Sequence, residues 1–210
     1  MNRRTFCGLI AAMMLALGAT GLVRTAVAEA DQAAARSFMQ TLGDNTLAVL
    51  SSDPTFNQAL PQLRPLFIQN FDMPTIGRFV LGRYWNQATP SQQTTYTDLF
   101  TEMVVRTYTR RFVGYDVGQT FQIDGSRADG DSDVIVQSQI IQTGGAPPIA
   151  VDWRVRDYGG GTYKILDVVI EGVSMAATQR SEFSSIIQRN GGSIDALLNL
   201  MQDNVNQASG

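Results

Sequence analysis

A stretch of alternating apolar and polar residues in the second half of the chain predicts a pair of amphipathic strands. Residues 149–156 follow a period of two, which puts large apolar groups on one face of a strand and charges on the other. Those apolar groups are Ile149, Val151, Trp153 and Val155. A turn containing three glycines follows, and residues 163–170 return as a second strand rich in β-branched side chains. The dry face of this pair covers either a solid core or a cavity.

The same pattern upstream predicts two more strands. Phe121 and Ile123 alternate with polar residues before an expected turn at Asp124-Gly125, and residues 134–141 form an apolar run typical of a strand. Residues 144–148 contain glycines and prolines and are predicted to be a loop. Short turns between consecutive strands indicate an antiparallel meander of four strands.

Helical spacing dominates the first half of the chain. Residues 31–50 carry an apolar stripe, and residues 55–70 also have a helical pattern. Pro61 and Pro65 within that second segment predict short or kinked pieces, because proline removes a backbone hydrogen bond. A short helix is predicted over residues 72–81, with a proline in its first turn and a glycine at its end.

The clearest helix signal is a capping box formed by Thr89 and Gln92, with a proline between them at the first helical position. The helix that begins there is predicted to run to about Val113, with Gly114 as its stop. Its apolar residues recur at helical spacing and make one broad stripe.

Helical spacing returns after the last strand. It covers residues 175–189, where Ser174 is expected to act as the N-cap, and resumes over residues 193–201. The polar tail from Asn204 is predicted to be frayed. Helices, then strands, then helices indicate an α+β fold, in which helices pack on one face of a curved four-stranded antiparallel sheet.

Residues 1–28 have the features of a secretory signal peptide. Arg3 and Arg4 precede an apolar run that is short for a membrane span and ends before the small-x-small sequence Ala26-Val27-Ala28. Cleavage is expected after Ala28, which leaves residues 29–210 as a single domain. The two arginines also have the spacing of a twin-arginine signal, so both that route and general secretion fit the sequence.

The composition lowers the expectation of catalysis. The chain has no histidine, and its one cysteine, Cys7, lies in the signal segment. The commonest general base, the soft metal ligands and the thiol nucleophile are therefore missing from the rest. Removing residues 1–28 takes away three of the 16 basic residues and none of the 19 acidic ones, which moves the net charge from −3 to −6. Nucleic acid and anionic membranes are poor partners for such a protein.

Three carboxylates are the candidates for acid–base chemistry: Asp152, Asp167 and Glu171. Asp167 stands out because it interrupts the expected face of Ile165 and Val169, where a carboxylate needs a partner. The favoured interpretation is a structural carboxylate bound by an arginine or a backbone N–H, and the alternative is a general base.

Two other polar patterns carry weaker signals. The aspartates between residues 124 and 133 lack the spacing and the final glutamate of a calcium loop, so they indicate a solvated acidic segment. The glycines at 159–161 join two strands and lack the Lys-Ser/Thr pair of a phosphate-binding loop, so they indicate a hairpin turn.

Large or adaptable apolar side chains are the remaining signal. On residue types alone, an ordinary core is favoured over a cavity. The side chains in question are Met73, Phe79, Tyr84, Trp85, Phe100, Met103, Tyr108, Trp153, Val173 and Met175.

Several spaced motifs resemble the MlaC-type proteins, also called the toluene-tolerance family of periplasmic phospholipid carriers. The likeness extends over roughly residues 33–201 and keeps the family's order of elements, although residues 144–148 have no clear family pattern. The motifs are Phe71-Asp72-Met73, Leu81-Gly82-Arg83-Tyr84-Trp85, Gln92 to Tyr108, and Asp167-Val168-Val169-Ile170-Glu171-Gly172-Val173-Ser174, with Arg180 and Phe183.

The resemblance implies a monomeric carrier in the periplasm. Such a protein exchanges glycerophospholipid with an inner-membrane ABC-transporter complex and with an outer-membrane lipoprotein–porin complex, and so maintains the lipid asymmetry of the outer membrane. Its helices and curved sheet enclose a deep apolar pocket that holds the acyl chains, while the head group stays near solvent. No catalytic residue, metal or cofactor is implied, and the bound phospholipid is cargo.

Within this family, the dry face of the strand pair becomes a cavity wall. Trp153 and Val155 are then expected to face acyl chains, and residues 173–175 to lie near the rim. The expected lining residues are Met73, Ile76, Phe79, Phe100, Met103, Val104, Tyr108, Val136, Val151, Trp153, Val155, Val169, Val173 and Met175.

Three alternatives compete with a phospholipid carrier. A small-molecule enzyme on a similar cone-shaped α+β scaffold would use Asp167 or Asp152 as its base and would need a polar pocket. A structural or adaptor protein would have a filled core and no extractable ligand. A carrier of another envelope lipid would hold a hopanoid-like molecule instead.

Overall fold

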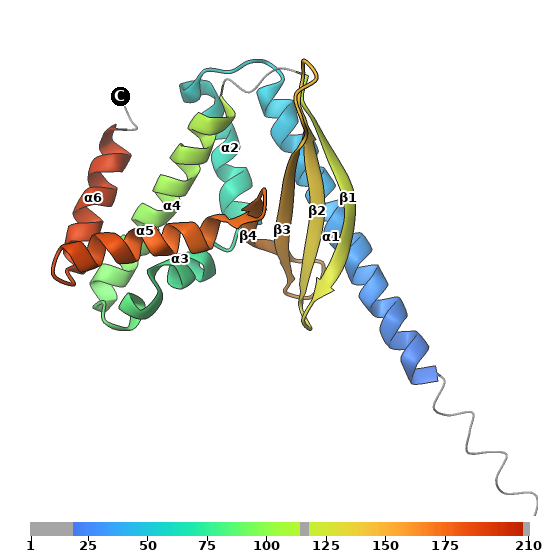
Figure 1. Ribbon diagram of the computed structural model, residues 1–210, viewed down its shortest axis with the longest axis horizontal. Coiled ribbons are helices and arrows are strands. Elements are labelled where there is room, and N and C mark those ends of the chain that lie inside the picture. Colours follow the sequence, from blue (N-terminus) through green and yellow to red (C-terminus); the bar gives the residue numbers. More distant parts are fainter. Residues whose placement is uncertain (1–18, 114–117, 208–210) are drawn as a thin grey trace, which may run out of the picture.

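The computed structural model describes residues 19–113 and 118–207. Helices α2 to α6 lie to one side of an antiparallel sheet, and α1 runs along that sheet (Figure 1). The helices are α1 (Ala19–Leu50), α2 (Phe56–Asn70), α3 (Met73–Leu81), the 3₁₀ helix η1 (Gly82–Asn86), α4 (Pro90–Phe112), α5 (Met175–Arg189) and α6 (Ile194–Gln207). The strands are β1 (Thr120–Asp129), β2 (Asp133–Ile141), β3 (Ile149–Asp157), β4 (Tyr163–Ile170) and β5 (Val173–Ser174).

The predicted signal peptide lies mostly outside the described residues, since the structure begins at residue 19. The expected cleavage point after Ala28 falls within the span of α1.

The strands pair in sequence order, and each is antiparallel to its neighbours. This confirms the predicted α+β fold with an open, curved antiparallel sheet. The sheet has a fifth strand, β5, which the sequence did not predict. It pairs only Val173 and Ser174 with Ile170 and Val169, and two residues are too few to produce a readable alternation.

The turn predicted at Asp124-Gly125 is wrong. The register between β1 and β2 shifts between Ile123 and Gly125, so Asp124 is the extra residue of a β-bulge. A bulge bends a strand without ending it, and β1 continues to Asp129. The chain turns at Gly130 instead, where φ is 79°.

Most helix boundaries agree with their sequence signals. Thr89 N donates to Gln92 Oε1 at 2.9 Å and Gln92 N donates to Thr89 Oγ1 at 3.2 Å, which confirms the capping box of α4. That helix ends at Phe112, and the predicted stop at Gly114 lies outside the described residues.

Two helix predictions are wrong. α2 is one continuous helix although it contains Pro61 and Pro65, because both prolines lie on its exposed side, where water can solvate the carbonyls that they leave unpaired. α6 continues to Gln207 instead of fraying from Asn204, since Val205 packs against the helical core.

Alternate residues of the strands pack against α1, and we call the face of the sheet that they form the inner face. Val134, Val136, Val155 and Ile165 are buried there against Ala35, Met39 and Leu42 of α1. The helix lies close to β1 at Gly43, where an added Cβ would lie 2.5 Å from the Phe121 ring. We call this cluster the sheet core.

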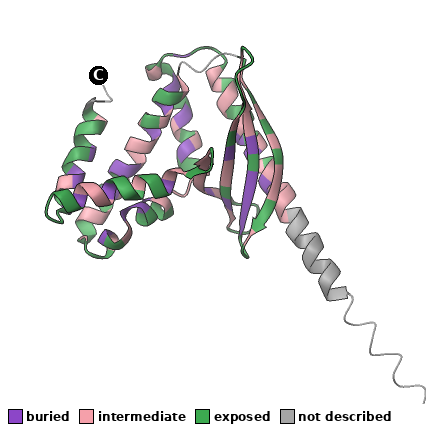
Figure 2. Cartoon of the chain, viewed as in Figure 1, coloured by how far each residue is buried: buried purple, intermediate pink, exposed green. Residues whose placement is uncertain are grey.

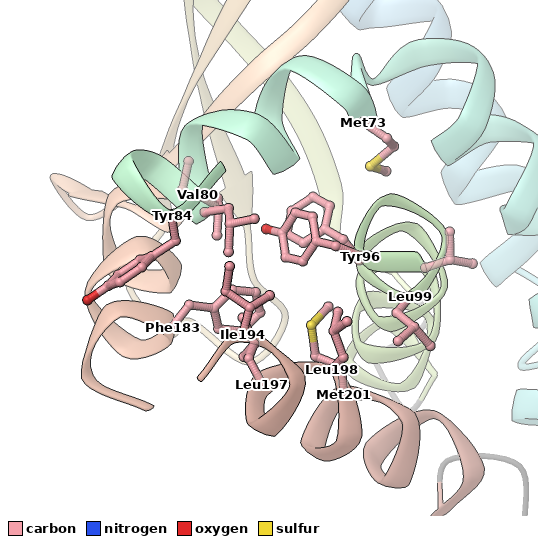
Figure 3. Close-up of a cluster of buried hydrophobic side chains, with 14 of the residues drawn as sticks. Met73, Val80, Tyr84, Tyr96, Leu99, Phe183, Ile194, Leu197, Leu198 and Met201 are labelled. Carbon is pink, nitrogen blue, oxygen red and sulfur yellow. The ribbon is translucent and has the colours of Figure 1, made fainter. Parts of the chain in front are cut away.

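A second cluster fills the space between α2, α3, α4, α5 and α6, and we call it the helical core. Figure 3 shows its centre, where Tyr96 and Leu99 of α4 lie near Leu198 and Met201 of α6. Tyr96 is fully buried, and its hydroxyl donates to the Gly77 carbonyl of α3 at 3.0 Å. Buried positions therefore occur in both layers of the molecule (Figure 2).

The outer face of the sheet is polar and carries a charged network around Asp133. Only 4% of the Asp133 side chain is exposed, and its carboxylate accepts hydrogen bonds from Arg154 Nε at 2.8 Å and Arg156 Nε at 2.7 Å. Burial opposes ionisation, but the hydrogen bonds from the two arginines outweigh it and hold the pKa of Asp133 below its ordinary value of 3.8.

Asp133→Asn should lower the unfolding free energy at pH 7 by about 1–3 kcal/mol, because it removes the negative charge between two arginines. Since the folded-state pKa is depressed, the stabilisation is present above about pH 5 and is lost as the pH falls through 3.8 and below. The gap between wild type and variant, measured by urea unfolding at several pH values, should therefore close toward pH 3. Asp131→Asn, in the exposed turn, is the control. A gap that stays constant with pH would contradict this role.

Candidate functional site

The helical core and the sheet core are joined at one end of α2. Leu66 and Phe71 are half-buried and pack against both cores. The segment that follows α2 lies against β4 at this point. The Asp72 N–H donates to the Ile165 carbonyl at 3.0 Å, and Phe71 forms a parallel bridge with Ile165. The Tyr158 hydroxyl also donates to the Asp72 carboxylate. This junction attaches the helices to the sheet, and half-buried apolar side chains extend from it along both layers.

On the helical side, four aromatic rings, from α2, from Phe71 just after its end and from α4, gather around Phe67 and form what we call the aromatic row. The Phe67 ring lies 5.4 Å from Phe71, 6.3 Å from Tyr108 and 6.2 Å from Phe112, measured between ring centroids. Such spacings are typical of packed aromatic side chains. Phe67 is buried, whereas the other three are half-buried and keep apolar surface uncovered by protein.

On the sheet side, Trp153 is half-buried on the inner face. Its indole N–H donates to Ser138 Oγ at 2.9 Å, and Ser138 Oγ donates in turn to the Val151 carbonyl at 2.8 Å. The edge of Phe121 packs against the Trp153 ring at 6.2 Å. The one polar atom of Trp153 is hydrogen-bonded within the sheet, so the exposed part of its ring is apolar surface on the inner face.

The structure divides the predicted lining residues into three groups. Five are at most 4% exposed and belong to packed protein: Met73, Phe100, Val136, Val151 and Val155. Two are largely exposed, Phe79 at 46% and Val173 at 52%. The half-buried ones, which retain free apolar surface, are Ile76, Met103, Val104, Tyr108, Trp153, Val169 and Met175.

A second β-bulge corrects the face predicted for Asp167 and Val169. Ile165 pairs with Val155, but Asp167 pairs with Arg154 and Val169 with Asp152, so the register shifts within β4. The shift puts Asp167 and Val169 on the face opposite Ile165. Val168, which pairs with Trp153, takes the inner-face position that the simple alternation gave to Val169.

Some residues that contribute to the half-buried apolar surface were not predicted. Phe71 and Phe112 are half-buried and pack against the buried Phe67, and the i, i+4 spacing of Leu63, Phe67 and Phe71 was the available signal. Val168 had no such signal, because nothing in the composition of β4 marks the bulge.

The Asp167 carboxylate anchors the start of α5. Oδ1 accepts hydrogen bonds from Val168 N at 2.8 Å and Ala176 N at 3.1 Å, and Oδ2 accepts one from Ser174 Oγ at 2.5 Å. Ser174 Oγ accepts in turn from Ala177 N at 3.0 Å, which confirms Ser174 as the N-cap. Both carboxylate oxygens are thus used in holding the helix terminus.

Tyr108 lies within electrostatic reach of this terminus. Burial raises the pKa of its phenol, the positive charge of Arg111 opposes that shift, and the negative charge of Asp167 adds to it. Arg111 is exposed, and its guanidinium lies 5.5 Å from the Tyr108 ring centroid. Tyr108 therefore stays uncharged over the whole neutral pH range and offers a ring with a neutral hydroxyl.

Two surface hollows lie on the outer face of the sheet and beside α1. One, of about 560 Å³, is lined by charged residues around Asp133 on the outer face, and its polarity suits water better than hydrocarbon. The other, of about 360 Å³, lies beside α1 and includes Phe38 and Tyr163. Neither includes a predicted lining residue.

Within residues 19–113 and 118–207, no three metal-ligating side chains gather into a group that could hold an ion. None of the helices described over these ranges is both long and apolar enough to cross a membrane.

Comparison with known proteins relates the chain to lipid-binding proteins. The family described as "MlaC protein" matches residues 40–203. A phospholipid-binding protein from Ralstonia solanacearum, whose structure was solved in complex with a phospholipid, superposes with a TM-score of 0.72 and 26% sequence identity. That superposition covers 83% of this chain and 98% of the Ralstonia chain.

Toluene tolerance protein ttg2D from Pseudomonas putida is 25% identical over 113 residues. The match takes in 54% of this chain and 51% of the Pseudomonas protein, so this chain aligns with about half the length of that relative.

The hydrogen bonds of Asp167 predict a structural role that can be measured. Asp167→Ala should lower the unfolding free energy by about 1–2 kcal/mol, and Ser174→Ala by about 1 kcal/mol, because each leaves backbone N–H groups of α5 unpaired. Because the two residues share a hydrogen bond, the double variant should lose less than the sum of the single losses.

Asp152→Asn is the control for this pair. It lies on β3 opposite Val169, and its substitution should change the unfolding free energy by less than about 0.5 kcal/mol. Urea unfolding curves for the four variants provide the test, and an Asp167→Ala variant as stable as wild type would contradict the anchoring role.

Proposed function

The chain belongs to the MlaC protein family, and we propose that it is a periplasmic carrier that holds phospholipid acyl chains between its helices and its sheet. One observation carries this proposal. The fold is shared with a phospholipid-bound protein over 98% of that protein's length, and half-buried apolar side chains pack against each of the two cores that meet at the end of α2.

The proposed lining comes from both layers. The helical wall consists of Phe71, Tyr108 and Phe112, and the sheet wall of Trp153 and Val168. Ile76, Met103, Val104 and Met175 extend the wall, and Val173, which is 52% exposed, lies at the rim. Large aromatic rings suit hydrocarbon chains because they add apolar contact area, and the indole N–H of Trp153 is already hydrogen-bonded.

The free energy of such binding depends on where the lipid comes from. Each methylene removed from water contributes about 0.8 kcal/mol, so two ordinary acyl chains offer on the order of 20 kcal/mol before costs. An acyl chain that leaves a bilayer was already shielded from water, so most of this free energy cancels. The free energy of lipid exchange with a membrane complex is then close to zero. The direction of exchange follows the difference between the affinities of the carrier and the complex for the lipid.

In this proposal, lipid moves between an inner-membrane ABC-transporter complex and an outer-membrane lipoprotein–porin complex, and the transfer maintains the asymmetry of the outer membrane. The N-terminal segment of residues 1–28 directs export to the periplasm. Family membership supports these steps, and the carrier acts without a catalytic centre.

The enzyme alternative is less well supported by the geometry of Asp167. Its carboxylate oxygens accept one hydrogen bond from Val168 N of β4 and two from Ser174 Oγ and Ala176 N at the start of α5, so neither oxygen is held ready to take a proton from a substrate. Asp167 lies on the face of the sheet opposite Ile165, and neither surface hollow includes it, whereas an enzyme of this kind needs a pocket in which polar groups converge on the reacting atoms.

Tyr108→Glu should abolish lipid retention while the fold persists. The new carboxylate would lie in the aromatic row and near Asp167. Acyl chains there would bury its charge at a high desolvation cost, and the negative charge of Asp167 would repel it. Native mass spectrometry of protein purified from cells measures the occupancy. Thr107→Glu is the matched control, because Thr107 is adjacent on α4 but exposed, and this variant should keep its lipid.

Organic extraction of the same wild-type preparation identifies the cargo. Glycerophospholipid is the expected product. A hopanoid would indicate another envelope lipid, and an empty wild-type protein, or full occupancy in Tyr108→Glu, would contradict the proposed cavity.

A further inference from the structure

Three arginines on α3, η1 and α5 are each held against an aromatic ring. The Arg78 guanidinium lies 5.9 Å from the Trp85 ring centroid, that of Arg83 lies 4.9 Å from Tyr84, and that of Arg180 lies 5.0 Å from Phe79. We call these six residues the arginine platform. Its elements are contiguous, since η1 follows α3 directly and α5 packs on α3.

The position of Arg180 depends on a glycine. Gly82 ends α3 with φ of 59°, and an added Cβ there would lie 3.0 Å from Arg180 Nε. The guanidinium is therefore confined between the Gly82 backbone and the Phe79 ring. Arg83 is fixed in a similar way, because its Nη2 donates to the Tyr84 hydroxyl at 2.9 Å. These contacts reduce the rotamer freedom that each arginine would otherwise lose on binding a partner.

The platform arginines have no anionic partner in the part of the chain that the structure describes. Arg78, Arg83 and Arg180 are all exposed, and none of them forms a salt bridge with a described carboxylate. By contrast, Arg64, Arg106, Arg154 and Arg156 are each paired with an aspartate or glutamate. The exposed ring of Phe79, 46% accessible, lies among the unpaired cations.

Along α3 and η1, the platform begins just beyond Ile76, the α3 residue of the proposed lipid wall. α3 leads away from the sheet, and η1 follows at its far end (Figure 1). Tyr84 is buried in the helical core, next to Val80 and Phe183 (Figure 3). Lipid binding therefore gives no reason for three exposed, pre-positioned cations at this place.

We propose that the arginine platform is the docking surface for a protein partner that presents carboxylates around an apolar socket for Phe79. Fixed guanidinium groups match carboxylates in two-point hydrogen bonds, and arginine and aromatic side chains contribute most of the affinity of many protein interfaces. An anionic bilayer is the less suitable occupant, since the whole chain carries a net charge of −3 and would be repelled outside this patch.

The test rests on the proposed function, because its probes are the purified inner-membrane ABC-transporter complex and the outer-membrane lipoprotein–porin complex of the same organism. The variant combines Arg78→Glu, Arg83→Glu and Arg180→Glu. Binding of the full exported protein to each complex, measured by biolayer interferometry, should weaken at least tenfold for one of them. The wild-type affinity for that complex should also fall with rising salt, as expected for exposed charge pairs.

The control variant combines Arg127→Glu and Arg189→Glu, two exposed arginines on β1 and at the end of α5. It makes a charge change of the same sign elsewhere and should bind as wild type does. Thermal unfolding of both variants checks the fold. Native mass spectrometry checks lipid occupancy, so failure of the proposed function, an empty wild-type protein, is distinguishable from failure of the docking proposal.

Three results would overturn the docking proposal. The first is a folded triple variant that binds both complexes within twofold of wild type. The second is a wild-type protein that binds neither complex. The third is loss of sedimentation with phosphatidylglycerol vesicles in the triple variant while binding to both complexes stays intact, which would make the bilayer the occupant.

Discussion

The attachment of the helices to the sheet at the Phe71–Ile165 crossing is the constraint on which the rest of the structure depends. Backbone hydrogen bonding between Asp72 and Ile165 fixes the two layers at one end of α2, and Leu66 and Phe71 bridge the two cores there. α1 covers part of the inner face of the sheet, and the helical core is closed by α6. Half-buried apolar side chains pack against each core, and in the proposed function acyl chains cover them.

Three of the described carboxylates, Asp133, Asp167 and Glu102, hold structural elements together. Asp133 joins two strands through Arg154 and Arg156, and Asp167 holds the start of α5. On α4, burial disfavours the charge of Glu102, but hydrogen bonds from Arg64 and Arg106 outweigh it and keep its pKa low. These hydrogen-bonded carboxylates hold strands, helices and a helix terminus relative to one another, and such satisfied networks make the frame rigid.

The sequence predicted those parts of the fold that depend on interactions between residues close together in the chain. The alternation of β3, the capping box at Thr89 and the glycine after α3 each depend on neighbours in sequence, and each was confirmed. Bulges at Asp124 and within β4 were missed, because an extra residue changes the face of a strand without changing its composition. The half-buried lining was the least predictable feature, since Phe100 and Tyr108 share one helical stripe and only tertiary packing buries the first completely.

The most direct test of the central claim uses a phospholipid that carries a photoreactive diazirine near the end of one acyl chain. The lipid is loaded onto the purified protein, irradiated, and its adducts are mapped by peptide mass spectrometry. Adducts on the α4 segment of residues 103–112 and on β3 at Trp153, competed away by unlabelled phospholipid, are the predicted result. Adducts confined to the outer face around Ile135, or to the groove beside α1 at Phe38 and Tyr163, would contradict it.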